Sequence, residues 1–144
     1  MAAVARYLAD KSALARLYLG EVRSALAPLI EAGLVATCAV IEFEVLWSTR
    51  SPEEFTTVRH DRTIGYEWLP TEDTDWRRAL EVQGLLWAAG RMRTVPLPDL
   101  LIAAVAERHR VTILHYDTDY DTIAAITRSG RGTVLIRPAT QSSP

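Results

Sequence analysis

Acidic residues follow two of the apolar segments in this sequence. Asp10 comes directly after one such segment, and Asp117 comes directly after another. Two more acids stand at the start of helical segments, namely Asp99 and one member of the pair Glu42 and Glu44. Ligands of an open parallel sheet bind outside the carboxyl ends of its strands, so we expect these four carboxylates to meet at one edge.

A cluster of carboxylates at that edge predicts a divalent cation. Like charges that are held close raise one another's pKa values, so several ionised carboxylates in one pocket are unstable alone. Mg²⁺ removes this repulsion, prefers oxygen ligands and keeps several waters, with Mn²⁺ as a substitute. One or two such ions can ionise a water and stabilise charge on a phosphate. The sequence has no cluster of histidines or cysteines that would favour zinc.

The elements that would position these acids alternate between strands and helices. We predict short apolar strands at residues 6–9, 34–40, 111–114 and 133–136, and a short extended segment at 66–70. Helices are predicted at 12–18 (with Ser12 as the cap and Gly20 as the break), 22–30, 41–48, from 51 onward, 74–89, 99–109 and 118–128. Continuously apolar strands are typical of a parallel sheet that is covered on both sides. The predicted fold class is therefore α/β, with helices on both faces of a parallel β-sheet.

Length and composition fit one domain. A chain of 144 residues that is 49% hydrophobic can bury a core. We expect residues 1–137 to form the domain and 138–144 to be a loose C-terminal tail. No apolar run reaches the roughly 20 residues of a membrane span, and residues 1–10 do not resemble a secretory signal, so we expect a cytoplasmic protein with no membrane partner. The formal net charge of −2 neither favours nor excludes RNA binding.

Four segments resemble the sequence motifs of the PIN-domain family, and of its VapC-type toxin ribonucleases in particular. Residues 7–14 resemble the first motif, a strand followed by Asp, any residue and Ser; residues 42–48 resemble the second. Residues 97–104, an aspartate leading a helix rich in small residues, and residues 117–124, Asp-x-Asp-aromatic before Ile-Ala, are the most specific matches. The four occur in the family's order across nearly the whole chain.

The resemblance implies a role for each acid. The implied metal-binding residues are Asp10, Glu44, Asp99 and Asp117, which would be catalytic, with Asp119 as a fifth ligand. Ser12 would support the first of them by a hydrogen bond. Glu42 stays the second choice to Glu44, because residues two apart on a helix point about 200° from one another and cannot face one metal equally.

The implied function is that of a toxin from a type II toxin–antitoxin system. Such a protein is an endoribonuclease that uses Mg²⁺ to hydrolyse RNA phosphodiester bonds, leaving a 5′-phosphate and a 3′-hydroxyl. A cognate antitoxin silences it, and it forms a homodimer. The candidate RNA phosphate contacts are Arg91 and Arg93, followed by Arg50 and Lys11, although a solvated charged loop explains these residues equally well.

Other interpretations of the same residues remain open or fail. The run Asp117-x-Asp119-x-Asp121 starts like a calcium loop, but Thr122 replaces the glycine that the loop needs. A phosphatase of the haloacid dehalogenase type would need more chain after Asp117, and a phosphoacceptor receiver domain would need a late lysine, whereas the sole lysine is Lys11. A non-catalytic interaction module with a PIN fold stays open. The four tryptophans would fill the core or line a protein interface.

Overall fold

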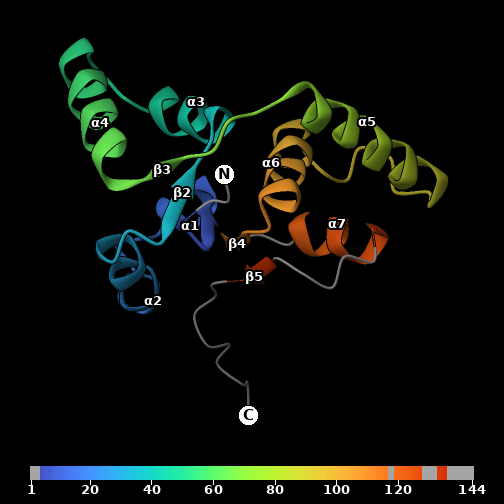
Figure 1. Cartoon of the computed structure of the whole chain (residues 1–144), viewed down its shortest axis with the longest axis horizontal. Helices are drawn as coiled ribbons and strands as arrows, with labels where there is room; N and C mark the ends of the chain where they lie inside the picture. The colour runs from blue at the N-terminus through green and yellow to red at the C-terminus, as the bar shows by residue number, and fades with distance from the viewer. Residues whose placement is uncertain (1–3, 117–118, 128–132, 136–144) are drawn as a thin grey trace.

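One parallel sheet organises the chain. The computed structural model describes residues 4–116, 119–127 and 133–135. Five parallel strands lie in the order β3-β2-β1-β4-β5 (Figure 1). Their bounds are Tyr7–Ala9 for β1, Val35–Thr37 for β2, Glu67–Trp68 for β3, Thr112–His115 for β4 and Thr133–Leu135 for β5. The predicted parallel sheet is confirmed, and every predicted strand has its counterpart in it.

Helices pack on both faces of this sheet, as predicted. They are α1 Lys11–Leu14, α2 Gly20–Glu31, α3 Ala39–Trp47, α4 Pro52–Gly65, α5 Asp73–Ala88, α6 Leu97–His109 and α7 Asp119–Thr127. Leu8 and Ile113 belong to a buried cluster formed with α5, α6 and α7, whereas Ala9 and Leu114 belong to a second cluster formed with α1 and α2. Neighbouring strand residues thus face opposite helical layers, as the pleat requires. None of the described helices is long and apolar enough to cross a membrane.

The sheet changes its winding direction at β1 and β4. These strands are neighbours, with Leu8 opposite Ile113, and the chain leaves them towards opposite faces, through α1 after β1 and α7 after β4. The amide of Asp10 donates to the carbonyl oxygen of Leu114 at 3.0 Å, which extends the pairing to the strand ends. Such a reversal opens a crevice at the carboxyl ends of the strands, where ligands of α/β proteins bind.

Several element boundaries differ from the prediction. Asp10, not Ser12, caps α1, because its Oδ2 accepts from the Ser12 amide at 3.0 Å. The helix ends at Leu14, and Gly20 begins α2 instead of closing its predecessor. Similarly, α6 begins at Leu97, two residues before Asp99, because its first turn accommodates a proline.

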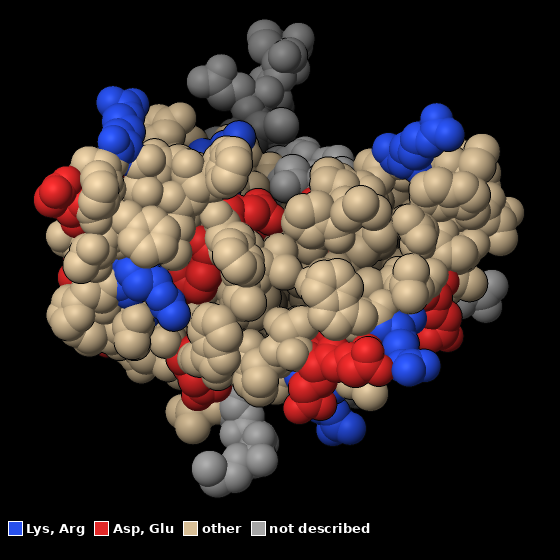
Figure 2. All heavy atoms as spheres, turned by 90° about the horizontal axis from the view of Figure 1, so that it is seen from above, with Lys and Arg blue, Asp and Glu red and all other residues tan. Residues whose placement is uncertain are grey.

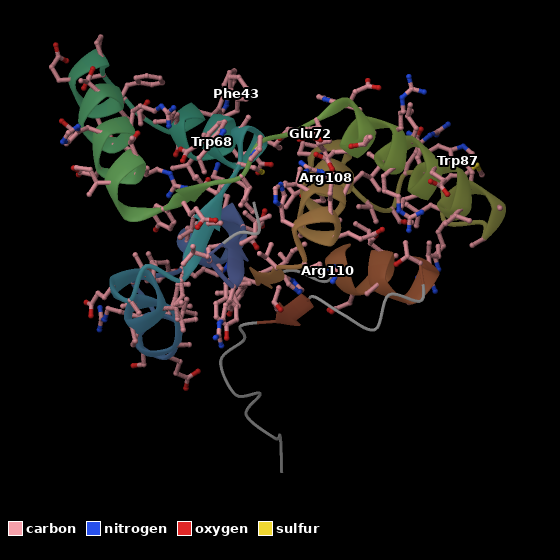
Figure 3. All side chains as sticks on the ribbon, viewed as in Figure 1. Phe43, Trp68, Glu72, Trp87, Arg108 and Arg110 are labelled. Carbon is pink, nitrogen blue, oxygen red and sulfur yellow. The ribbon has the colours of Figure 1, made fainter. Side chains whose placement is uncertain are left out.

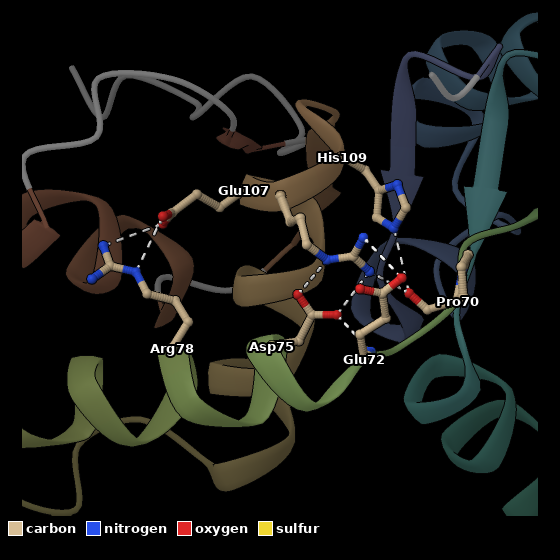
Figure 4. A network of polar contacts seen from close by, with 7 residues as sticks. Pro70, Glu72, Asp75, Arg78, Glu107 and His109 are labelled. Atoms are coloured by element: carbon tan, nitrogen blue, oxygen red, sulfur yellow. Dashed lines mark hydrogen bonds and ion pairs between the residues drawn. The ribbon is translucent and has the colours of Figure 1, made fainter. Parts of the chain in front are cut away.

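A network of ion pairs joins α5 to α6 (Figure 4). Asp75 is 1% exposed and accepts from Arg108 at 2.8 Å (Nε to Oδ1) and 2.9 Å (Nη2 to Oδ2). Arg108 also donates to the carbonyl oxygen of Pro70 at 2.8 Å, and Arg78 lies 3.1 Å from Glu107. The network fixes the end of α6 against the start of α5, and α6 is the helix that carries Asp99 at its other end.

Candidate active site

Three of the predicted acids line one cavity. It has a volume of about 340 Å³, and its walls include Asp10 from the end of β1, Glu44 from α3 and Asp99 from the first turn of α6. These residues come from three elements that only the sheet and its helices bring together. The structure therefore brings Asp10, Glu44 and Asp99 to the wall of one cavity, at the crevice beside β1.

Local structure holds two of these carboxylates in place. Asp10 is 3% exposed, and the amide of Ser12 fixes its Oδ2 as the cap of α1. Asp99 is 7% exposed and lies in the first turn of α6, where the positive end of the helix dipole favours a negative charge. Both acids are thus held with little side-chain freedom at the wall of the cavity.

Glu42 and Glu44 face different surroundings. The Glu42 carboxylate is buried and meets the Nε of Arg62 at 2.8 Å and 3.1 Å. Arg62 in turn donates to Thr37 at 3.3 Å and lies over the ring of Tyr66 at 4.4 Å. This buried ion pair engages Glu42 in packing α3 against α4. Of the two glutamates, only Glu44 is among the residues that line the acidic cavity.

Ser12 joins the two strand ends at this site. Its amide makes the hydrogen bond to Asp10 described above, and its hydroxyl accepts from the amide of Tyr116 at 2.9 Å. Tyr116 directly precedes Asp117, which lies outside the described residues, as does the side chain of Asp119. The hydrogen bond predicted between Ser12 and the first acid therefore comes from the backbone, while the hydroxyl binds the end of β4.

The chemical type of the ligands at this cavity fits a hard divalent cation. Asp10, Glu44 and Asp99 offer only carboxylate oxygens, which Mg²⁺ prefers over nitrogen or sulfur. Within the described part of the chain, no three His, Cys, Asp or Glu side chains group closely enough to hold a metal by themselves. A metal here would draw on water and on the acids expected after β4 as well as on these three.

The basic residues of the cavity differ from the predicted RNA contacts. Lys11, which was predicted, and Arg16, which was not, both line it. Arg91, Arg93 and Arg50 are exposed, and none of them is among the lining residues. Arg16 stands four residues after Ser12, about one helical turn, so its spacing from the first motif was the signal that could have revealed it.

All four tryptophans are exposed, which excludes the first of the two alternatives for them, a place in the core. Their exposed fractions are 89% for Trp47, 49% for Trp68, 57% for Trp76 and 40% for Trp87. Together with Phe43, which points away from the sheet in Figure 3, Trp47 and Trp68 line a second cavity of about 350 Å³ beside α3 and α4. Figure 2, which looks down on α3, α4 and α5, shows wide uncharged areas on this face, with acidic side chains between them. The interface interpretation of these aromatic residues stays open.

Two buried polar side chains lie beside the site without lining it. Burial raises the pKa of the Cys38 thiol to about 11, and the charges of Glu42 and Asp10 add to that effect. His115, at the end of β4, is fully buried, with its Nε2 3.9 Å from Oδ1 of Asp121. Neither side chain is among the residues that line the acidic cavity.

Comparison with known proteins agrees with this arrangement. The chain is 48% identical over 123 residues to Ribonuclease VapC21 of Mycobacterium tuberculosis. The aligned region covers 85% of this chain and 89% of that protein. It is 41% identical over 122 residues to Ribonuclease VapC51 of the same organism, covering 85% and 88%. Among solved structures, DNA-bound VapBC from Salmonella typhimurium has a TM-score of 0.72 at 12% identity, covering 93% of this chain and 100% of that one. A toxin–antitoxin complex from Klebsiella pneumoniae has a TM-score of 0.67 at 20% identity, covering 91% and 98%.

The two structural likenesses concern the fold, and the sequence likeness concerns the family. The PIN domain family matches residues 7–126, a range that holds Asp10, Glu44 and Asp99 as well as the strands around the cavity. The family match covers most of the chain, and the relatives named above share more than a third of its aligned residues. The chain belongs to the PIN domain family.

Proposed function

We propose that this protein is a metal-dependent endoribonuclease toxin that hydrolyses RNA phosphodiester bonds and is inhibited by a cognate antitoxin. The observation that carries the proposal is the cavity that Asp10, Glu44 and Asp99 line. The names of its relatives, ribonucleases at 48% and 41% identity, support the same activity. We place this activity in the cytoplasm.

The residues of the cavity supply the binding and orientation that such a reaction needs. Asp10, Glu44 and Asp99 would hold Mg²⁺ or Mn²⁺, with Asp117 and Asp119 as further ligands. When bound, the ion supplies an ionised water and stabilises charge on the phosphate. The amide of Ser12 holds Asp10, and α6 holds Asp99, so these ligands need little rearrangement. We expect products with a 5′-phosphate and a 3′-hydroxyl.

Two protein partners belong to the proposal. Solved structures that share the fold include a toxin–antitoxin complex and a DNA-bound VapBC complex, which supports a cognate antitoxin. We expect it to bind near the acidic cavity. A homodimer would cover part of the exposed apolar surface, which includes Trp76 and Leu80 on α5. Light scattering of the purified protein tests the second point, and a monomer would contradict it.

Cleavage of mixed cellular RNA by the purified, antitoxin-free protein tests the activity. We expect discrete products with Mg²⁺ or Mn²⁺, and none with a chelator. Asp99→Asn should remove cleavage without unfolding the protein, because replacing one acid lowers the repulsion among the others. Asp73→Asn is the matched control, since Asp73 is an exposed acid of α5 that pairs with Arg77 on the surface.

The outcomes separate the enzyme from the alternative. Full activity of a folded Asp99→Asn variant would reject the assignment of this acid. If the folded protein binds Mn²⁺ but cuts none of the RNAs, the proposal of an enzyme fails, and a non-catalytic interaction module takes its place.

A further inference from the structure

Arg16 lies in the wall of the acidic cavity, in the turn that follows α1. Two contacts fix its guanidinium group. The Nη1 donates to the carbonyl oxygen of Ser12 at 2.7 Å, and the Cζ lies 4.3 Å from the centre of the Tyr116 ring. The side chain thereby contacts both Ser12, within the first acid motif, and Tyr116, the residue that follows β4.

These two contacts do not neutralise the charge of Arg16, since a carbonyl oxygen and an aromatic ring carry no formal negative charge. No carboxylate among the described residues forms an ion pair with it, and its hydrogen-bond acceptor is a neutral carbonyl. A guanidinium has five N–H donors, of which the Ser12 carbonyl uses one. Other arginines of the chain, such as Arg62 and Arg108, form ion pairs with carboxylates instead.

The surroundings of Arg16 favour the binding of an anion by its guanidinium group. RNA that approaches three carboxylates is repelled, and the basic residues among the described ones that line the cavity are Lys11 and Arg16. An arginine that is already oriented loses little freedom when it binds, and its planar fork matches two oxygens of a phosphate group. Lys11, a point charge on a flexible stem, lacks this geometry.

We propose that Arg16 is a substrate-binding residue that grips a backbone phosphate of RNA beside the acids, with the Ser12 carbonyl and the Tyr116 ring setting its direction. The inference rests on the proposed function and adds a specific contact to it. In this proposal Arg16, and not the exposed Arg91 or Arg93, is the principal phosphate contact at the cavity.

Binding without cleavage tests this role. Fluorescence anisotropy would follow a labelled single-stranded RNA of mixed sequence, with chelator present, over a series of salt concentrations. Arg16→Gln should weaken binding about tenfold, the effect of losing a charged hydrogen bond. The slope of log affinity against log salt should fall by about 0.7, the value for one lost phosphate contact on a single strand. Arg23→Gln, at an exposed arginine of α2, is the matched control and should change neither quantity.

A second variant separates charge from geometry. Arg16→Lys should keep most of the salt dependence but raise the KM for RNA in the presence of Mg²⁺, because lysine lacks the two-pronged contact. If Arg16→Gln binds RNA with unchanged affinity and salt slope, the proposal is overturned, even where its melting temperature falls. Wild-type protein that binds RNA through Arg16 but never cuts it would sustain this inference while rejecting the nuclease. Wild-type protein that neither binds nor cuts RNA would reject both.

Discussion

The two glutamates of α3 should respond in opposite ways to the same substitution. Glu42 forms a buried ion pair with Arg62, whereas Glu44 lines the acidic cavity. Glu42→Gln should therefore lower stability and spare the activity of the folded protein. Glu44→Gln should remove the activity and spare stability. Because both changes replace a carboxylate by an amide on one helix, each variant is the control for the other.

The size of the first effect follows from the burial of the pair. The side chains of Arg62 and Glu42 are 8% and 6% exposed, and removing one partner of such a pair costs about 3–5 kcal/mol. Arg62 keeps its contacts with Thr37 and Tyr66, and the glutamine oxygen still accepts a hydrogen bond, so we expect the lower end, about 3 kcal/mol. For a domain of this size, that loss corresponds to a melting temperature lower by roughly 10 °C.

The second effect has the opposite sign. Glu44 shares its cavity with Asp10 and Asp99, so a neutral glutamine relieves repulsion between like charges. The melting temperature of the Glu44→Gln variant, measured without divalent metal, should equal or exceed that of the wild type. Its cleavage of RNA should disappear, since a ligand of the proposed metal is lost.

Thermal melting and RNA cleavage of both variants test these two roles. Cleavage is measured well below the melting temperature of the less stable variant. A Glu42→Gln variant that melts with the wild type would refute the reasoning from the buried pair. A folded Glu42→Gln variant without activity, beside an active Glu44→Gln variant, would reverse the assignment. The double change Glu42→Leu with Arg62→Met should recover most of the lost stability, because neither charge is then left alone in the core.

Further predictions concern stability and reactivity. Burial raises the pKa of Asp75, but the hydrogen bonds from Arg108 outweigh it and hold that pKa below its ordinary 3.8. The ionised carboxylate should therefore contribute its full stability above about pH 4, and this contribution should be lost as the pH falls through the pKa of Asp75 in the folded protein. When unfolding is followed against pH, the Asp75→Asn variant should lack this loss. Burial raises the pKa of Cys38 to about 11, so an alkylating reagent at about pH 8 should label it in denaturant but not in the native protein; rapid native labelling would contradict this. Arg110, labelled in Figure 3, ends α6 with a φ of 57°, and Arg110→Gly should raise stability by up to about 1 kcal/mol in chemical denaturation.

The sequence alone determined the order of strands and helices. Apolar runs mark buried strands, although the run predicted as a strand at 34–40 also includes the start of α3 at Ala39, and turn residues and caps mark where elements change. The parallel sheet and the placement of Asp10 and Asp99 at one edge of it follow from that order. These features could be predicted because they depend on local patterns and on the small number of ways in which alternating strands and helices can pack.

Finer choices depended on residues far away in the chain. Glu42 and Glu44 look alike in sequence, and only Arg62, which is 20 residues after Glu42, distinguishes them. The hydroxyl of Ser12 binds an amide that is 104 residues away, so local reasoning made it a helix cap instead.

Arg16 and the tryptophans also show what local sequence patterns predict and what only tertiary packing decides. Arg16 lies over the ring of Tyr116, which is 100 residues away in the sequence and follows β4, and Trp47, at the last position of α3, is left exposed. A local pattern records which elements form and which residues are apolar. It does not record which side chain finds its charge partner, or which apolar side chain is left on the surface, because those outcomes depend on the packing of elements that are distant in sequence.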